Sequence, residues 1–393
     1  MELEIRVQVP SAPKKIKNKI MKKEIIELTK KLVSISSYVD GDCNEAKIAD
    51  FICGFLKKNC PWLKVEKQKV AKGRFNVIAK DNYPTKLLVC GHLDTVIPRS
   101  GWKFNPLKPQ IKGGKLYGLG ALDMKGSLAS FLIALKYQKS TKGLLLLFYI
   151  DEEYNFLGMR KFVSSYKLWQ EPKLIFSLDG GDLKIGYACR GLIDIDFEVI
   201  GKSGHAAWPK SGKNAIIAVT KTVEGLSKTL KKDFSDPILG PSVCNLAILE
   251  TDNKSRNVIP ARAIAKLDIR PANSELKGKE IIKILKSELK KQRVKLGEYK
   301  VLNDLGPRLT QKESLQELKK IIEKVLNQKT EFVEPKNCGY GDSSMLYEKY
   351  RMPTASFGPR PDKMAHQANE YVLIDDLVKC SQVFTEIIRK YCP

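Results

Sequence analysis

Three short apolar runs, each followed closely by histidine or acidic residues, limit what this chain can fold into more than any other feature. Each run is too short for a helix, and its continuous apolar character is typical of a strand buried in a parallel sheet. Sites in open α/β sheets are built at the carboxyl ends of the strands. We therefore expect the polar residues to meet at one sheet edge. The runs are Leu87–Val89, Leu144–Ile150 and Leu174–Leu178, and the residues after them include His92 and Asp94, Glu152 and Glu153, and Asp179.

The first of these segments places His92 and Asp94 two residues apart. Side chains at that spacing lie on the same side of an extended backbone, so we expect the two to be close together. An imidazole beside a carboxylate is typical of a metal ligand and the partner that orients it. A histidine that only caps a loop is the alternative, and the His-x-Asp spacing taken alone favours it.

The chain has only three histidines, His92, His205 and His366. Each is flanked by small residues or turn formers, as expected where the backbone closely approaches a ligand. With the acids at the strand ends, two of them could form one acidic pocket. Its expected members are His92, Asp123, Glu152, Glu153, Asp179 and His366.

Crowded carboxylates repel one another, and without cations some of them would have to stay protonated. Two divalent metal ions would remove this repulsion. Imidazole and carboxylate ligands suit zinc, with cobalt or manganese as substitutes. Taken alone, an acid such as Asp123 would more often be a loop carboxylate or a helix cap than a metal ligand. The glycine-rich stretch 113–122 before it lacks the P-loop lysine pattern and a complete dinucleotide fingerprint, so we expect no phosphate site there.

The order of elements predicts two domains, as expected for 393 residues. From about residue 189 the strands alternate apolar and polar residues and are interspersed with amphipathic helices, a pattern typical of a small α+β unit with helices on one side of a sheet. The simplest arrangement is an α/β domain interrupted by this unit. The expected parts are a basic N-terminal extension over residues 1–21, an α/β domain formed by 22–188 and 300–393, and an inserted α+β domain over 189–299.

The net charge of +25, from 69 basic and 44 acidic residues, raises nucleic acid or another polyanion as a partner. The lysines are spread over expected helix surfaces, as in Lys283–Lys295, and no basic segment is interleaved with aromatic residues. We therefore expect a general lysine-rich surface and no nucleic-acid site, with polyanion binding left open as a side activity.

The cysteines and the length of the apolar runs indicate the cellular location of the protein. The nine cysteines are odd in number and form no Cys-x-x-Cys pair, which favours reduced thiols in a cytoplasmic protein. No apolar run approaches the roughly 20 residues that span a membrane. The first residues carry no pattern of a secretory signal. We therefore expect a cytoplasmic protein with no membrane partner.

Six motifs, taken together and in order, resemble the two-zinc amidohydrolases that include acetylornithine deacetylase, succinyl-diaminopimelate desuccinylase, aminoacylase and carboxypeptidase G. The resemblance covers nearly the whole chain from about residue 22. It implies a mixed-sheet, zinc-peptidase-like catalytic domain with an inserted, ferredoxin-like α+β domain that serves as a lid or in dimerisation. The motifs are Gly-His-Leu-Asp-Thr-Val, Gly-Lys-Leu-Tyr-Gly-Leu-Gly-Ala-Leu-Asp-Met-Lys-Gly, Asp-Glu-Glu, Gly-Lys-Ser-Gly-His-Ala, Asp-Ile-Arg-Pro and Ala-His-Gln-Ala-Asn-Glu-Tyr.

The resemblance assigns five residues to two metal ions. It implies that Asp123 bridges the two ions, that His92 and Asp179 complete one site, and that Glu153 and His366 complete the other. It also implies a non-proline cis peptide bond after Asp123, a feature expected at functional sites.

Two further roles follow from the same resemblance. Asp94 would orient His92 by accepting its second N–H. Glu152, left without a metal, would be the general base that takes a proton from the bridging water and delivers it to the leaving amine.

Residues of the inserted domain are assigned to the substrate. In the family, a histidine at the position of His205 reaches the active site of the partner subunit of a homodimer and stabilises the oxyanion. Asn257 and Arg270 resemble positions that grip a substrate carboxylate. Gly358 could offer backbone contacts to the substrate. A surface loop for His205 and a surface ion pair for Arg270 are the alternatives.

The sequence leaves the substrate open. The motifs around His92, Asp123 and His366 favour hydrolysis of a small N-acyl amino acid of the acetylornithine or succinyl-diaminopimelate type. Asp179 precedes two glycines where the deacylases usually have Glu-Pro-Thr, and an aspartate there is more typical of the family's dipeptidases and aminopeptidases. A dipeptidase or other exopeptidase is therefore the alternative. A catalytically inactive binding relative is less favoured, because all five ligands and Glu152 are present.

Overall fold

The computed structural model describes residues 14–393 except 42–43, 169 and 360–363. The described chain forms two compact units. The first ends at Gly186 and resumes over Gln311–Phe332 and Tyr350–Pro393; the second comprises Tyr187–Thr310 and Val333–Lys349. Most of the expected N-terminal extension, residues 1–13, lies outside the described residues, while residues 14–21 belong to the first helix.

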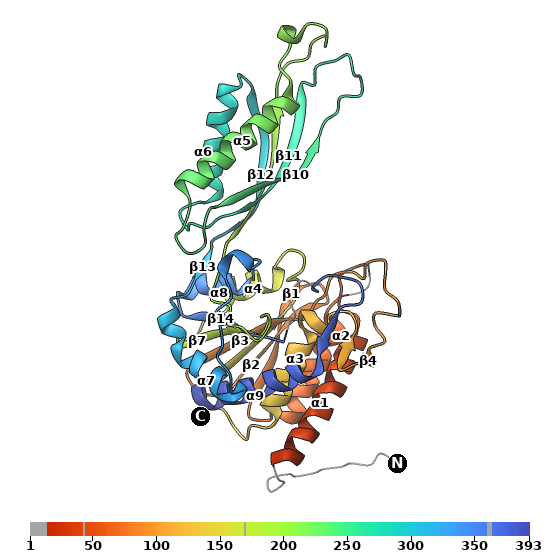
Figure 1. The fold of residues 1–393 in the computed structure, drawn as a ribbon, viewed down its shortest axis with the longest axis vertical. Coiled ribbons are helices and arrows are strands. Elements are labelled where there is room, and N and C mark those ends of the chain that lie inside the picture. Colours follow the sequence, from red (N-terminus) through yellow and green to blue (C-terminus); the bar gives the residue numbers. More distant parts are fainter. Residues whose placement is uncertain (1–13, 42–43, 169, 360–363) are drawn as a thin grey trace. The chain divides into compact units, whose positions relative to one another are not determined.

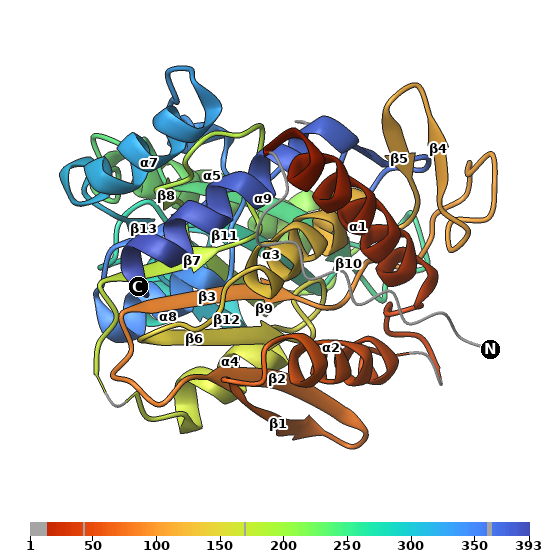
Figure 2. The same cartoon turned by 90° about the horizontal axis from the view of Figure 1, so that it is seen from below.

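A six-stranded mixed sheet forms the centre of the first unit, in the order β1-β2-β6-β3-β7-β14. Figure 2 shows the order from β1 to β7. β3 pairs in parallel with β6 on one side and with β7 on the other, and β14 continues the parallel set. β1 and β2 are antiparallel. The sheet is therefore mixed, as the sequence predicted. The strands are β1 Lys64–Ala71, β2 Arg74–Lys80, β3 Leu87–His92, β6 Leu144–Tyr149, β7 Leu174–Ser177 and β14 Thr354–Ser356.

The central strands β3 and β6 are apolar and buried along their whole length, so they form the core on which the helices pack. α3 packs against α1 and α9, and the three lie together on one side of the sheet (Figure 2). α7 packs against α9, whereas α2 and α4 contact the β1–β2 part of the sheet. The helices are α1 Lys14–Ser34, α2 Ala46–Asn59, α3 Gly126–Lys136, α4 Leu157–Ser165, α7 Gln316–Leu326 and α9 Ile374–Tyr391.

A small three-stranded sheet brings two distant loops together in the first unit. β15 (Tyr371–Leu373) pairs with β5 (Lys115–Tyr117), which pairs with β4 (Gln110–Lys112). The loop that carries His366 therefore lies beside the glycine-rich stretch that leads to Asp123.

The second unit is an antiparallel four-stranded sheet in the order β10-β11-β9-β12, with α5 and α6 on one face (Figure 1). This strand order, in a chain that runs β9-α5-β10-β11-α6-β12, is ferredoxin-like, as predicted. Apolar residues from one face of the sheet and from both helices form its core. The elements are β9 Leu192–Ile200, α5 Ala215–Asp233, β10 Val243–Glu250, β11 Arg262–Arg270, α6 Gly278–Lys291 and β12 Lys295–Leu305.

β12 runs across the expected domain boundary at 299/300, because its pairing with β9 continues to Leu305. The second unit also contains two short strands and one short helix, β8 (Ala188–Cys189), β13 (Arg308–Leu309) and α8 (Ser343–Tyr350). None of the helices in the described part of the chain is both long enough and apolar enough to cross a membrane. The remaining short helical turns are η2 Pro209–Ser211, η3 Lys312–Leu315 and η4 Pro335–Asn337.

Candidate active site

The strand order explains how the first site residues meet. β6, β3 and β7 are neighbours and run in the same direction, so their carboxyl ends lie at one edge of the sheet. His92 is the last residue of β3, Glu152 and Glu153 follow β6, and Asp179 follows β7. The sequence prediction that these ends converge is therefore met by the topology.

Asp123 lies in a π-helical turn, η1 (Ala121–Lys125), directly before α3. The peptide bond from Asp123 to Met124 is cis, as the family resemblance implied. Gly120, which precedes the turn, has φ +72°, and a Cβ there would lie 2.5 Å from Thr95. Glycine is thus required at this position by both backbone conformation and space.

His366 comes from the far end of the chain. It has φ +62°, and its Nε2 lies 2.9 Å from Glu153 Oε2 and 3.4 Å from Asp123 Oδ2. On the other side of Asp123, His92 Nε2 lies 3.1 Å from Asp123 Oδ1. The Asp123 carboxylate therefore lies between two imidazoles, with one oxygen toward each.

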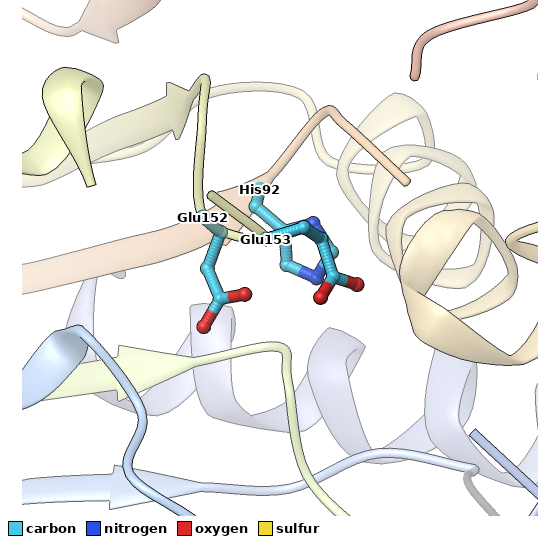
Figure 3. A group of neighbouring side chains, drawn as sticks. All are labelled: His92, Glu152 and Glu153. Atoms are coloured by element: carbon cyan, nitrogen blue, oxygen red, sulfur yellow. The ribbon is translucent and has the colours of Figure 1, made fainter. Parts of the chain in front are cut away.

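Among the residues that the structure describes, three overlapping groups of side chains have potential metal-ligating atoms within 4.8 Å of one another. Asp123 belongs to two of these groups, which together contain all five expected ligands. The third joins Glu152 to His92 and Glu153, and Figure 3 shows these three side chains beside one another. The groups are His92, Asp123 and Asp179; Asp123, Glu153 and His366; and His92, Glu152 and Glu153.

The electrostatics of the cluster show how strongly these charges interact. Burial and the neighbouring charge of Asp123 raise the pKa of Glu153. Hydrogen bonds to Asp123 and Glu153 raise the pKa of His366 to about 10. Burial opposes the charged form of His92, yet its bonds to Asp123 and Asp94 outweigh burial and raise the pKa of that imidazole. Two imidazoles and several buried carboxylates in mutual reach are a donor set that fits a pair of divalent cations.

Asp94 is fully buried, and its carboxylate holds the turn that carries the two glutamates. Its Oδ1 accepts from the backbone N–H of Glu152 at 3.1 Å, and its Oδ2 accepts from that of Glu153 at 2.9 Å. The nearest acceptor for His92 Nδ1 is the backbone oxygen of Asp94 at 3.1 Å, whereas Asp94 Oδ1 is 3.6 Å away. Sequence reasoning placed Asp94 beside His92 and expected its carboxylate to accept from the imidazole, whereas the backbone oxygen is closer. It missed the two amide bonds.

Gly358 lies against the loop that follows β7. A Cβ on Gly358 would lie 3.0 Å from the backbone oxygens of Leu178 and Gly180. Its own carbonyl accepts from the Leu183 N–H at 3.2 Å. The residue thus maintains a close approach of two backbone segments beside Asp179, and its oxygen already has a partner.

The remaining expected residues lie in the second unit. His205 and Asn257 are on adjacent exposed loops, joined by a bond from the Ala206 N–H to the Asn257 carbonyl at 2.8 Å. Arg270 ends β11, at the opposite end from Arg262, which pairs with the strand leading to His205. The strand has nine residues, and eight intervals of about 3.4 Å separate its two ends by about 27 Å.

Arg270 makes the ion pair that the alternative interpretation expected. Its Nε and Nη2 bind Asp268 Oδ1 and Oδ2, each at 2.7 Å. The guanidinium is 38% exposed, so this pair contributes little stability. It holds the side chain in one orientation.

Sequence reasoning missed two groups of residues near the site. Glu370 is buried, its backbone oxygen accepts from Gly118 and its carboxylate from Leu122 at 3.5 Å, and burial together with Asp123 raises its pKa to about 8. A buried ion network formed by Glu45, Arg74 and Asp151 lies directly before the Glu152 turn. Glu370 stood within the last recognised motif and Asp151 begins the Asp-Glu-Glu motif, whereas nothing in the sequence marked Glu45 or Arg74.

Imidazoles and carboxylates gathered at one edge of a mixed α/β sheet are a donor set that suits a metal-dependent hydrolase. Residues 88–390 match the family described as Peptidase family M20/M25/M40, and the chain belongs to that family. It is a hydrolase that acts on amide or peptide bonds, as the motifs predicted.

Curated relatives and solved structures carry different names within this family. The chain is 28% identical over 406 residues to succinyl-diaminopimelate desuccinylase of Wolbachia pipientis, with 94% of each chain covered. A tripeptidase from Staphylococcus aureus has a TM-score of 0.75 and 20% identity, covering 94% of this chain and 98% of its own. A dinuclear metal-binding peptidase from Bacillus subtilis has a TM-score of 0.66 and 16% identity, covering 94% and 98%.

Proposed function

We propose that the protein hydrolyses the amide bond of a small N-acyl amino acid, of the succinyl-diaminopimelate or acetylornithine type, with two divalent metal ions. One observation carries this proposal: five ligand side chains from five chain segments meet around Asp123, with a further carboxylate, Glu152, beside them. Zinc is the expected metal, with cobalt or manganese as substitutes, because the donors are imidazoles and carboxylates.

The ligand groups would divide between the two ions through Asp123. His92 and Asp179 would hold one ion with Asp123, and Glu153 and His366 would hold the other with it. When bound, the ions supply Lewis acidity and lower the pKa of a bound water.

Glu152 does the proton work in this proposal. Its carboxylate atoms lie within 4.8 Å of ligating atoms of His92 and Glu153, close enough to serve a nucleophile at the metal pair. It would accept the proton of the attacking water and then give it to the nitrogen of the leaving amine. Asp94, through the amides of Glu152 and Glu153, would keep that carboxylate in place.

We also propose that the protein is a homodimer in which His205 serves the partner subunit's active site. His205 Nδ1 accepts from the Ala207 N–H at 3.1 Å, which leaves Nε2–H as the donor that an oxyanion requires. The separation of Asn257 from Arg270 by the length of β11 supports a site that takes the two from different subunits. The edge strand β10 exposes Val243, Ile248 and Leu249, which is consistent with coverage by a second copy.

Arg270 would bind a substrate carboxylate with its guanidinium oriented by Asp268, and Gly358 would shape the backbone beside Asp179.

The substrate class is supported by the names of the curated relatives. Several of them are succinyl-diaminopimelate desuccinylases at 27–30% identity.

We also propose a cytoplasmic location, since the eight described cysteines are free thiols.

A dipeptidase or other exopeptidase is the second candidate. It is favoured by Asp179 followed by two glycines and by the peptidase names of the similar structures. A polypeptide that only binds such molecules is the least favoured reading, because no ligand and no base is missing.

A substrate panel on metal-reconstituted protein tests the proposal. Succinyl-diaminopimelate, acetylornithine and other N-acyl amino acids would be compared with dipeptides and tripeptides, with metal stoichiometry measured in the same sample. We expect turnover of an N-acyl amino acid with two metal ions bound. Efficient dipeptide turnover with inert acyl substrates would reject the first candidate in favour of the second.

The base assignment is tested by Glu152→Ala and Glu152→Gln. Both should retain two metal ions and lose at least about 1000-fold in kcat, within the contribution of general acid–base catalysis. Full activity of either variant would refute the role of Glu152. Absence of turnover by the wild type on every substrate, with both ions bound, would support the binding-only alternative.

A further inference from the structure

Hydrogen bonds within the turn that follows β6, and an ion pair with another strand, fix the conformation of that turn. Asp151, its first residue, has φ +70°, a left-handed conformation that aspartate tolerates better than most residues. Asp151 Oδ2 accepts from the backbone N–H groups of Asn155 and Leu157, and its carbonyl accepts from Phe156 at 2.7 Å. The backbone of the turn is thus wrapped around the Asp151 side chain.

The other oxygen of that carboxylate binds a guanidinium from a different strand. Arg74, on β2, donates from Nη2 to Asp151 Oδ1. The same Nη2 and the Nε of Arg74 also bind the two oxygens of Glu45, with the Nε–Oε2 distance at 2.8 Å. The side chains of Glu45 and Asp151 are 0% and 1% exposed, and that of Arg74 is 13% exposed.

Glu45 directly precedes α2, so the network ties the start of α2 to the Glu152 turn through β2. Burial raises the pKa of Glu45 above its ordinary value, and the bond from Arg74 opposes that rise. Hydrogen bonding to Glu45 is the largest cause of a raised pKa for Arg74. The Arg74 guanidinium binds both carboxylates, and its planar fork binds the two oxygens of Glu45 through two different nitrogens, which the single nitrogen of a lysine cannot reproduce.

We infer that Arg74 is a positioning residue for Glu152: it fixes Asp151, and with it the direction in which the next residue presents its carboxylate. The inference rests on the proposed role of Glu152 as base. Asp94 holds the Glu152 amide from one side at 3.1 Å, and Arg74 holds the preceding residue from the other. Neither Arg74 nor Glu45 belongs to any of the three metal-ligand groups found among the described residues.

The inference is tested first with Arg74→Lys, which keeps the charge but loses the fork. Displacing a reacting group by about 1 Å reduces rates by up to about 100-fold. We therefore expect kcat to fall about 10- to 100-fold, with KM within about twofold and two metal ions still bound. Lys136→Gln is the matched control, because it removes a half-buried ion pair with Glu24 in the same unit and should leave kcat unchanged.

A second measurement does not depend on activity. In metal-free protein, amide hydrogen exchange of residues 150–158 should be faster in Arg74→Lys than in wild type, while exchange in β6 stays the same. Wild-type exchange in this segment, or wild-type kcat with a lowered unfolding temperature only, would overturn the inference and leave Arg74 a purely structural residue.

The route through Asp151 is tested by a double-variant cycle. Asp151→Asn keeps a side chain that tolerates the left-handed conformation but removes the charge that Arg74 binds. If Arg74 acts through Asp151, combining the two substitutions should lower kcat no further than the stronger one alone. Multiplying effects would overturn the route. Loss of activity in Glu152→Ala with wild-type kcat in Arg74→Lys would reject this inference only, whereas an active Glu152→Ala would reject the proposed base.

Discussion

Replacing Asp94 with asparagine separates two roles of this residue: binding the backbone amides of Glu152 and Glu153, and orienting the imidazole of His92. The substitution retains size and one oxygen, but it places an NH₂ group where a carboxylate oxygen accepts from a backbone amide. Either Glu152 or Glu153 then loses its acceptor. The nearest acceptor of His92 Nδ1 is the backbone oxygen of residue 94, at 3.1 Å, and the substitution does not remove it.

The expected magnitude follows from the bond that is lost. A hydrogen bond to a buried charged group contributes about 1.5–3 kcal/mol. Because about 1.4 kcal/mol is tenfold in a binding constant, release of Glu153 would weaken a metal site that contains it by about 10- to 150-fold. A site that depends on His92 should change by less than about threefold, since that imidazole keeps its closest partner.

Metal titration calorimetry in two backgrounds measures each site separately. His366→Ala leaves the group of His92, Asp123 and Asp179, and His92→Ala leaves the group of Asp123, Glu153 and His366. Asp94→Asn should weaken metal binding strongly in the His92→Ala background and weakly in the other. The reverse result would mean that Asp94 acts chiefly by orienting His92, as the family resemblance implied, and would refute the reasoning from the amide bonds.

Three other predictions follow from the structure. Gly180→Ala should destabilise the protein by about 1–3 kcal/mol and displace Asp179, because its Cβ would lie 2.4 Å from the backbone of Phe357; Gly54→Ala, which meets nothing within 4 Å, is the control in urea unfolding. Burial raises the pKa of Cys60 from 9.0 to about 12. The unfolded chain therefore releases that proton first, and the free energy of unfolding should fall between pH 9 and 12 with a smaller slope in Cys60→Ala; an equal slope would contradict this. Removing metal with a chelator should abolish turnover and lower the unfolding temperature, both restored by zinc, since bound cations stabilise the folded state; an unchanged unfolding temperature with both ions removed would count against a site in the folded chain.

The elements that build the sheet were predictable because their apolar runs are long enough to define a strand and too short for anything else. Leu144–Ile150 appears as β6 and Leu174–Leu178 as β7, each within a residue. Parallel pairing then forces the residues after these strands to one edge, so the meeting of His92 with Glu153 follows from topology alone. The alternation of the second unit predicted a small α+β unit with helices on one side of a sheet, and the family resemblance implied its ferredoxin-like arrangement.

Other features depend on contacts that no local pattern records. The expected boundary at 299/300 failed to include the end of β12, because an exposed edge strand such as Gly297–Leu305 has little apolar alternation of its own. The His366 position came from a motif and not from periodicity. The sequence could not tell whether Arg270 pairs with the carboxylate of Asp268 or binds a substrate carboxylate, because both interactions suit a guanidinium.

The division between what was and was not predictable has a physical basis. Ligands must reach a common point, and strand ends bring them there with an accuracy set by the sheet. A base must also point in one direction, and that depends on the backbone conformation of the residue before it. In this chain Arg74, itself bound to Glu45, binds Asp151, and Asp94 binds the backbone amide of Glu152. No sequence motif marks Arg74 or Glu45. The partly buried guanidinium of Arg74, bound to two buried carboxylates, is the part of the site that a single arginine substitution can test.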